Sequence, residues 1–183
     1  GNAIGNAQLN QNNQDISADT LIYSKPVKKE GANYTALGNV KIISEDRIIT
    51  SGKAHYRFDD EIARLTINPK VTSDEDILEG EELIAHFKDE ELHYLLIPSK
   101  AKASSIQQND VIGEYKDDMT GNVLKAYFLE GKLDSMRLEG MATTLYHVFD
   151  DSLFQGINTT SGDTISLQFN DQELQQILVL GGA

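Results

Sequence analysis

The side chains of this chain that could do chemistry are mostly acidic or imidazole groups. The 183 residues include four histidines and no cysteine. His55 and His86 stand beside aromatic residues in two similar stretches, so we expect them on neighbouring strands, both facing outward. Two imidazoles are too few for a zinc or copper site. We therefore expect no metal and no cofactor.

Three acidic runs offer oxygen ligands, Asp59-Asp60-Glu61, Asp74-Glu75-Asp76 and Asp89-Glu90-Glu91. All three fall where turns are expected, and such runs usually serve as solvated loop tips that keep a surface soluble. The alternative function of these runs is calcium binding, because carboxylate oxygens are the ligands that this ion prefers. The chain lacks the EF-hand spacing and the GGxGxD repeat that would support it. The calcium alternative stays open.

Catalytic motifs are missing from the chain. It has no GxSxG, no HExxH, no cysteine nucleophile and no phosphate-binding loop. The stretches "GMATTLYH" and "NTTSGD" combine Ser and Thr with Gly and Asp, which is typical of turns. We expect a protein that is not an enzyme.

Composition narrows the class of protein further. The net charge of −13 disfavours nucleic acid, whose phosphates an acidic surface repels. No apolar run approaches the length of a transmembrane helix. Glycine outnumbers proline, 14 to 3, and aliphatic residues are frequent, which favours many short strands.

A triplet that ends in Ala or Val occurs six times along the chain. It reads GNA at 5–7, GNV at 38–40, PKV at 69–71, SKA at 99–101, GMA at 140–142 and GGA at 181–183. A second recurring segment, which we call the second column, begins with a small residue that is usually followed by a charged or amide residue. It occurs at 18–21, 52–55, 80–83, 121–124 and 162–165. Recurrence at this period predicts stacked structural repeats. We expect one repeat-built domain over 1–183, taken from a longer chain.

Each repeat is predicted to be a strand pair. The segments "GEELIAHF", "GNVLKAYF" and "GDTISLQF" alternate apolar and polar residues, as half-buried strands do. A turn and a second apolar strand follow, and then the small-residue triplet lets the strand bend. The insertions 104–118 and 146–160 are predicted to lengthen two hairpins and broaden one end. No window has helical periodicity, so the fold class is all-β, an elongated antiparallel stack with open edge strands.

These features resemble the OstA-like family, which includes LptA, LptC and the periplasmic part of LptD. The stretches that carry the resemblance are "ISADTLIYSK", "YTALGNVKII" and the segment from Leu138 to Ala183. The resemblance implies a V-shaped β-jellyroll in the periplasm, associated with the outer membrane. It implies lipopolysaccharide, or a related lipid, as cargo in an apolar groove. It also implies partner Lpt-type β-jellyroll modules, or further copies in a head-to-tail homo-oligomer, joined through edge strands near 18–23 and 165–179. The alternative is a structural repeat scaffold for outer-membrane protein assembly, without lipid.

The expected lipid-facing side chains are the apolar residues on the inward face of the strands. They are Leu21, Tyr23, Val40, Ile42, Tyr56, Phe58, Leu65, Ile67, Leu83, Phe87, Leu95, Ile97, Leu124, Phe128, Met136, Leu138, Ile165, Leu167, Phe169, Ile177 and Val179.

Overall fold

The structure, a computed structural model, describes residues 1–11, 14–25, 31–44, 47–89, 91–110, 112–130, 132–150, 153–170 and 173–181. These residues form fifteen strands and no helix, and none of their segments is a helix that could span a membrane. The strands are β1 (Asn2–Gln11), β2 (Gln14–Ser24), β3 (Asn33–Ser44), β4 (Arg47–Arg57), β5 (Ile62–Thr66), β6 (Lys70–Ser73), β7 (Asp76–Glu79), β8 (Glu82–Lys88), β9 (Glu91–Ile97), β10 (Ala101–Asn109), β11 (Gly113–Gly121), β12 (Val123–Leu129), β13 (Lys132–Asp150), β14 (Leu153–Asn170) and β15 (Glu173–Leu180).

All strands belong to one antiparallel sheet that divides and rejoins. β1 to β4 pair in sequence. β4 then pairs with β5 through Lys53–Arg57 and with β6 through Arg47–Thr50. The two branches meet again on β13, which pairs with β12 on one side of its bend and with β11 on the other. A sheet that divides in this way is bent along its length rather than flat.

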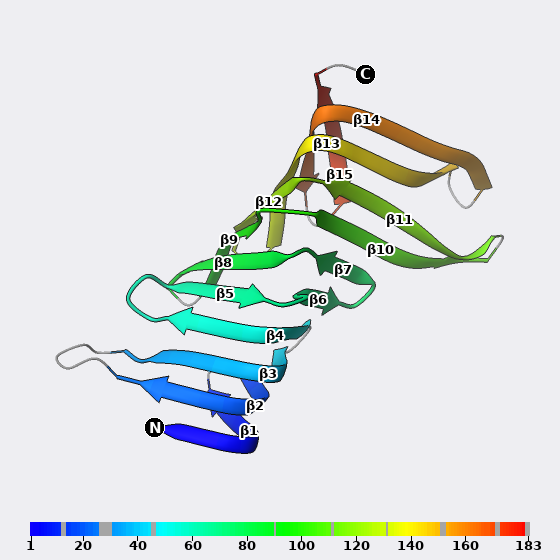
Figure 1. Cartoon of the computed structure of the whole chain (residues 1–183). Helices are drawn as coiled ribbons and strands as arrows, with labels where there is room; N and C mark the ends of the chain where they lie inside the picture. The colour runs from blue at the N-terminus through cyan, green and yellow to red at the C-terminus, as the bar shows by residue number, and fades with distance from the viewer. Residues whose placement is uncertain are drawn as a thin grey trace.

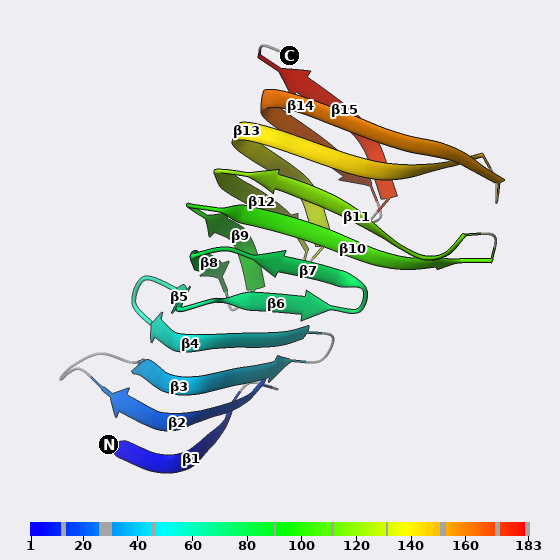
Figure 2. The ribbon, with the colours of Figure 1, turned by 45° about the vertical axis from the view of Figure 1, so that its right-hand side comes forward.

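The bend separates two layers, which we call arm A and arm B. Arm A contains β5, β8, β9, β12, β15 and one half of each bent strand, and arm B contains β6, β7, β10, β11 and the other halves. Figures 1 and 2 show the strands stacked in a twisted column from the N-terminus to the C-terminus. The predicted all-β, repeat-built fold is confirmed.

The recurring triplet forms the corner between the arms. At Gly38 and Asn39 φ is 72° and 46°. The φ angles are likewise positive at both residues of Gly5–Asn6 and of Gly140–Met141. The strand register shifts at each of these places. Glycine tolerates this backbone, and Asn does so better than most residues. The triplet therefore repeats because every turn of the column needs one bulged corner.

The second column lies against the triplets of neighbouring strands. The amide of Gly52 donates to the carbonyl of Ile67 at 2.8 Å, and that of Asn122 donates to the carbonyl of Gly140 at 2.9 Å. Ser99 Oγ donates to Glu81 Oε2 at 2.9 Å. Backbone amides of the second column thus satisfy carbonyl groups at the corner that the bulge removes from the strand ladder.

The inner faces of the arms pack on a shared apolar core. Its fully buried members include Leu83, Ile97, Leu124, Leu138 and Ile165. Arm B contributes Ala101, Ala103 and Ala142 to the same cluster. Alanines opposite larger aliphatic residues let the two layers approach closely. A smaller cluster near the N-terminal end contains Ala18, Ala36 and Val40.

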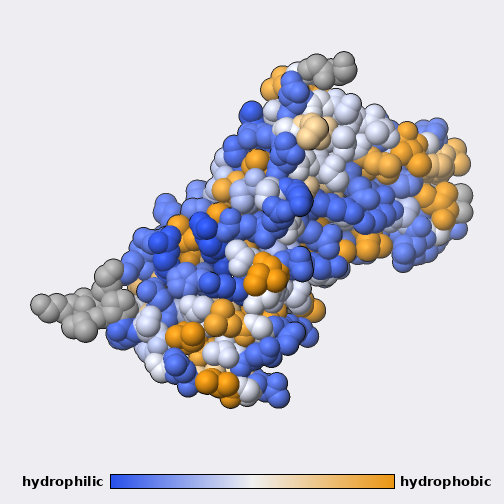
Figure 3. All heavy atoms as spheres, viewed as in Figure 1, coloured by the Kyte–Doolittle hydropathy of each residue, from blue (hydrophilic) through white to orange (hydrophobic). Residues whose placement is uncertain are grey.

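Arm B lengthens toward the C-terminal end, as the two insertions predict. β6 and β7 have four residues each, whereas β10 and β11 have nine, and β13 and β14 have 19 and 18 over both arms. The long hairpins project to one side in Figures 1 and 2. Apolar side chains gather at the tip of the β13–β14 hairpin (Figure 3, right), where Val148, Leu153 and Ile157 are exposed.

Candidate functional site between the two arms

The inner face of arm A is built from cross-strand rows of apolar side chains. The row beside the corner runs through Leu65 and Leu83, which pair directly, and continues through Leu124, Leu138 and Ile165. Each of these side chains is at most 3% exposed. The row is continuous because side chains at paired register positions share a face of the sheet. Next to the corner, the interior is therefore filled by the protein itself.

A row of phenylalanines lies farther from the corner, beside the hairpin turns of arm A. Phe87, Phe128 and Phe169 occupy the same place in successive repeats, opposite Leu92, Leu133 and Leu174. A register shift precedes each phenylalanine. Their side chains are half-buried and pack on the edge of the core. We call this outer row the mouth, because apolar area there is still open to solvent.

The predicted inward-facing residues fall into three groups in the structure. Ten are buried: Val40, Leu65, Leu83, Leu95, Ile97, Leu124, Met136, Leu138, Ile165 and Leu167. Six are half-buried: Leu21, Ile42, Tyr56, Phe87, Phe128 and Phe169. Five are exposed: Tyr23, Phe58, Ile67, Ile177 and Val179. Their lipid-binding role stays a prediction.

The exposed group has distinct local causes. Ile67 has a φ of 67°, which breaks the alternation, and its side chain is 62% exposed against Gly52. The buried position at this corner belongs to Pro69, so the inward orientation predicted for Ile67 is wrong. Phe58 follows the end of β4 and lies in the turn toward β5.

Ile177 and Val179 do lie on the inner face, opposite Leu167 and Ile165. They are exposed because β15 pairs only with β14 among the described strands. β1 is the corresponding edge at the other end of the column. The edge strand predicted near residues 18–23 is wrong, because these residues lie in β2. That strand is paired on both sides, with β1 and β3.

Arm B contributes inward residues that the predicted lipid-facing set left out. Ile49, Val71, Leu78, Met119 and Tyr146 pack against the same core. Burial raises the pKa of the Tyr146 phenol, whose hydroxyl donates to the Met119 sulfur at 3.3 Å. Apart from Val40 and Ile42, that set was drawn from the strands of arm A. The apolar–polar alternation around Val71 and Leu78 is the signal that could have extended it.

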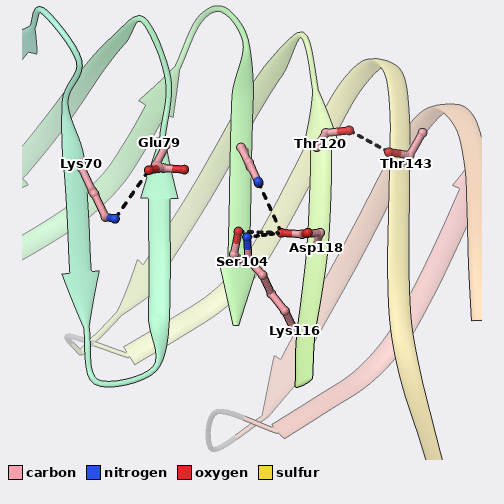
Figure 4. Close-up of polar contacts among 8 residues, drawn as sticks. Lys70, Glu79, Ser104, Lys116, Asp118, Thr120 and Thr143 are labelled. Carbon is pink, nitrogen blue, oxygen red and sulfur yellow. Dashed lines mark hydrogen bonds and ion pairs between the residues drawn. The ribbon is translucent and has the colours of Figure 1, made fainter. Parts of the chain in front are cut away.

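The outer face of arm B is polar and cross-linked between strands (Figure 4). Asp118 accepts a hydrogen bond from Ser104 at 2.7 Å and pairs with Lys116 at 3.1 Å. Burial acts to raise the pKa of Asp118, but these two bonds and the charges of Lys102 and Lys116 together hold the pKa below its ordinary value. Thr120 and Thr143 share a hydrogen bond at 2.7 Å. Arm B is thus apolar on its inner face and polar on its outer face.

Comparison with known proteins decides the family. A family model described as "LptA/(LptD N-terminal domain) LPS transport protein" matches residues 2–91, which run from β1 to the start of β9. This match, over 90 of the 183 residues, supports an OstA-like/LptA family assignment. No curated protein matches the chain. The OstA-like assignment from the repeated motifs is confirmed.

The match to the LptA/LptD N-terminal family implies a role in lipopolysaccharide transport. The family is one of lipid-transport modules rather than of enzymes. The matched part contains the corners at residues 5–7 and 38–40. The strands beyond residue 91 repeat the same corner at 140–142.

The candidate metal ligands are not assembled into a site. Within the described ranges, no group of three His, Asp or Glu side chains is placed to hold a metal ion. His55 on β4 and His86 on β8 are separated by β5, where they lie opposite Arg64 and Ile62. The acidic runs at 59–61 and 74–76 lie at the predicted turns. The third run includes Glu90, which lies outside the described residues.

Proposed function

We propose that the chain carries lipopolysaccharide with its acyl chains between the two arms, at the mouth rather than beside the corner. The observation that supports this is the row formed by Phe87, Phe128 and Phe169, apolar and half-open along successive repeats. The rows beside the corner are already filled. Burying one methylene group stabilises a complex by about 0.8 kcal/mol. A few acyl chains therefore need no specific polar contact.

We also propose that the module works in the periplasm, beside the outer membrane, and is joined end to end with other modules. β1 and β15 each pair on one side only among the described strands. On β15, Leu178 and Leu180 are exposed together with Ile177 and Val179. Adding a strand to such an edge satisfies its backbone groups and covers its apolar side chains. The partner is an Lpt-type module or a second copy of this chain.

A structural scaffold without lipid is the second candidate, and the packing beside the corner favours it. Leu124, Leu138 and Ile165 have no exposed surface, so that part of the interior needs no ligand to fill it. The two functions differ at the mouth. A scaffold requires only that the mouth pack, whereas a carrier requires that it admit an acyl chain.

Site-specific photo-crosslinking separates the two candidates. A photoreactive amino acid replaces Phe128 in one variant and its neighbour Leu129, which is 65% exposed, in another. Both are incubated with purified lipopolysaccharide, and separately with palmitic acid. We expect crosslinks to both ligands at 128 and none at 129. Folded protein that crosslinks at neither position would favour the scaffold.

A further inference from the structure

The outer face of arm A carries a shallow depression of about 250 Å³ that the lipid groove does not explain. It is lined by His55 and Arg57 from β4 and by Ile62 and Arg64 from β5. These side chains are on the outward side of the two strands. Arg57 is opposite Ile62, and His55 is opposite Arg64. The depression is therefore separated from the interior by the sheet itself.

The lining has the opposite charge to the chain as a whole. The chain carries a net charge of −13, yet the four lining residues include two guanidinium groups, one imidazole and no carboxylate. The nearby acids form surface ion pairs: Arg57 with Asp60 at 3.0 Å, and Arg64 with Glu82 at 2.8 Å. Both arginines are about half exposed. Such pairs contribute about 0–1 kcal/mol, so an incoming anion can replace them at little cost.

A row of aromatic rings begins at the edge of this depression. The strand register places Ile62 opposite His86, His86 opposite Tyr94, and Tyr94 opposite Tyr127. The ring centroids of His86 and Tyr94 are 5.4 Å apart, and those of Tyr94 and Tyr127 are 4.9 Å apart. Tyr127 is 43% exposed. Aromatic rings aligned on an outer face give a flat platform with polar edges.

The depression and the platform form one continuous surface. Neighbouring strands lie about 4.8 Å apart, so the span from β5 to β12 is roughly 14 Å. That span matches a short ligand with a negative charge at one end and a ring at the other. Guanidinium groups bind phosphate oxygens in a bidentate fork. Aromatic side chains offer an apolar face to the C–H groups of a sugar ring.

We propose that the outer face of arm A binds a phosphorylated saccharide. The phosphate contacts Arg57 and Arg64 in the depression, and the sugar rings lie along His86, Tyr94 and Tyr127. The acidic remainder of the chain disfavours long polyanions such as nucleic acid. This site is independent of the acyl-chain groove, since it lies on the other side of the sheet.

The test is a titration of the whole chain with maltose 1-phosphate, followed by amide chemical shifts and by calorimetry. Maltose and inorganic phosphate, titrated separately, supply the saccharide and the anion alone. We expect maltose 1-phosphate to shift signals on the outer faces of β4, β5, β8, β9 and β12. We expect it to bind at least tenfold more tightly than either part. Binding should weaken as the salt concentration rises, because exposed charges are screened.

Two sets of variants divide the site. The double variant Arg57→Gln/Arg64→Gln should raise the Kd for maltose 1-phosphate at least tenfold. Tyr127→Ser should raise that Kd and leave the Kd for inorganic phosphate unchanged. The matched control is Lys70→Gln/Lys102→Gln, which removes two exposed cations from arm B and should change neither. All these positions are partly exposed, so the unfolding midpoints should stay within a few degrees.

Two outcomes would overturn the proposal. If the arginine double variant and the arm B control bind maltose 1-phosphate with equal affinity, the ligand does not bind in the depression. Equal affinity for maltose 1-phosphate and inorganic phosphate would leave an anion site without saccharide recognition. Neither outcome bears on crosslinking at position 128, so the transport proposal is judged separately.

Discussion

The side-chain amide of Asn39 donates to both carboxylate oxygens of Asp19, at 3.2 and 3.0 Å. Asn39 is the middle residue of a corner triplet on β3, and Asp19 belongs to the second column on the neighbouring strand β2. The two repeating sequence columns thus meet in space. Their polar members hold one strand's corner against the next.

Replacing Gly38 with alanine tests this corner. Gly38 has a φ of 72°, and an added Cβ would lie 2.2 Å from Asp19 Oδ2. We expect a loss of about 1–3 kcal/mol in the free energy of unfolding, measured with urea, from backbone strain and the displaced carboxylate. Gly5→Ala is the control, since Gly5 has a φ of 82° but nothing within 4 Å. In an Asp19→Ala background the cost of Gly38→Ala should fall to that of Gly5→Ala, and an unchanged cost would contradict this account.

Thr144 is a buried residue whose hydroxyl has no hydrogen-bond partner among the described residues. It is 1% exposed, and an unpaired buried hydroxyl is costly. Thr144→Val keeps the side-chain shape and should raise the free energy of unfolding by about 1 kcal/mol. Thr143→Val, on the exposed side of the same strand, loses the hydrogen bond to Thr120 and should not raise the free energy of unfolding. Thermal unfolding of both variants checks the sign, and destabilisation by Thr144→Val would show that the hydroxyl has a partner in solution.

Asp117 ties β11 to β13 on the long part of arm B. One of its carboxylate oxygens accepts from the backbone amide of His147 at 2.9 Å and contacts the His147 ring nitrogen Nδ1 at 2.8 Å. The backbone ladder between these two strands is short and involves only Asp118 to Thr120 of β11. Asp117→Ala should therefore loosen the contact between β11 and β13 at His147. Because the lost hydrogen bond is worth about 1–3 kcal/mol, amide exchange at His147 should increase at least tenfold. Asp60→Ala, an exposed acid on arm A, is the control, and unchanged exchange at His147 would refute the proposed tie.

Glu139 gives arm A a pH-dependent contribution to stability. The hydrogen bond from Lys125, at 2.9 Å, holds the pKa of Glu139 below its ordinary value of 4.5. A lowered carboxylate pKa stabilises the folded state above pH 4.5, and the benefit is lost as the pH falls through the lower value. Glu139→Gln should cost about 0.5 kcal/mol at pH 7, because the pair is partly exposed, and less near pH 3. Denaturation of the parent and the variant at both pH values measures this difference, with Glu114→Gln as the control. A cost that persists at pH 3 would assign the effect to packing.

Much of the fold could be predicted from the sequence because its local signals are repeated. Alternation in "GEELIAHF" and "GNVLKAYF" predicted β8 and β12, and the apolar columns predicted which side chains of arm A share a face. Leu65, Leu124 and Leu138 are accordingly buried. Alternation fails at Ile67, where the backbone leaves the extended region.

The candidate site was only partly predictable. The sequence determined that the chain repeats a corner, presents one apolar face per strand and belongs among acidic, strand-rich proteins, since these depend on neighbouring residues alone. Only the tertiary structure decided that β4 divides between two branches, that arm B supplies Met119 and Tyr146 to the core, and that β1 rather than β2 forms the edge. It also brought Arg57, His86 and Tyr127 onto one surface. These relationships depend on which strands pair, and pairing is set by packing over the whole column rather than by any single repeat.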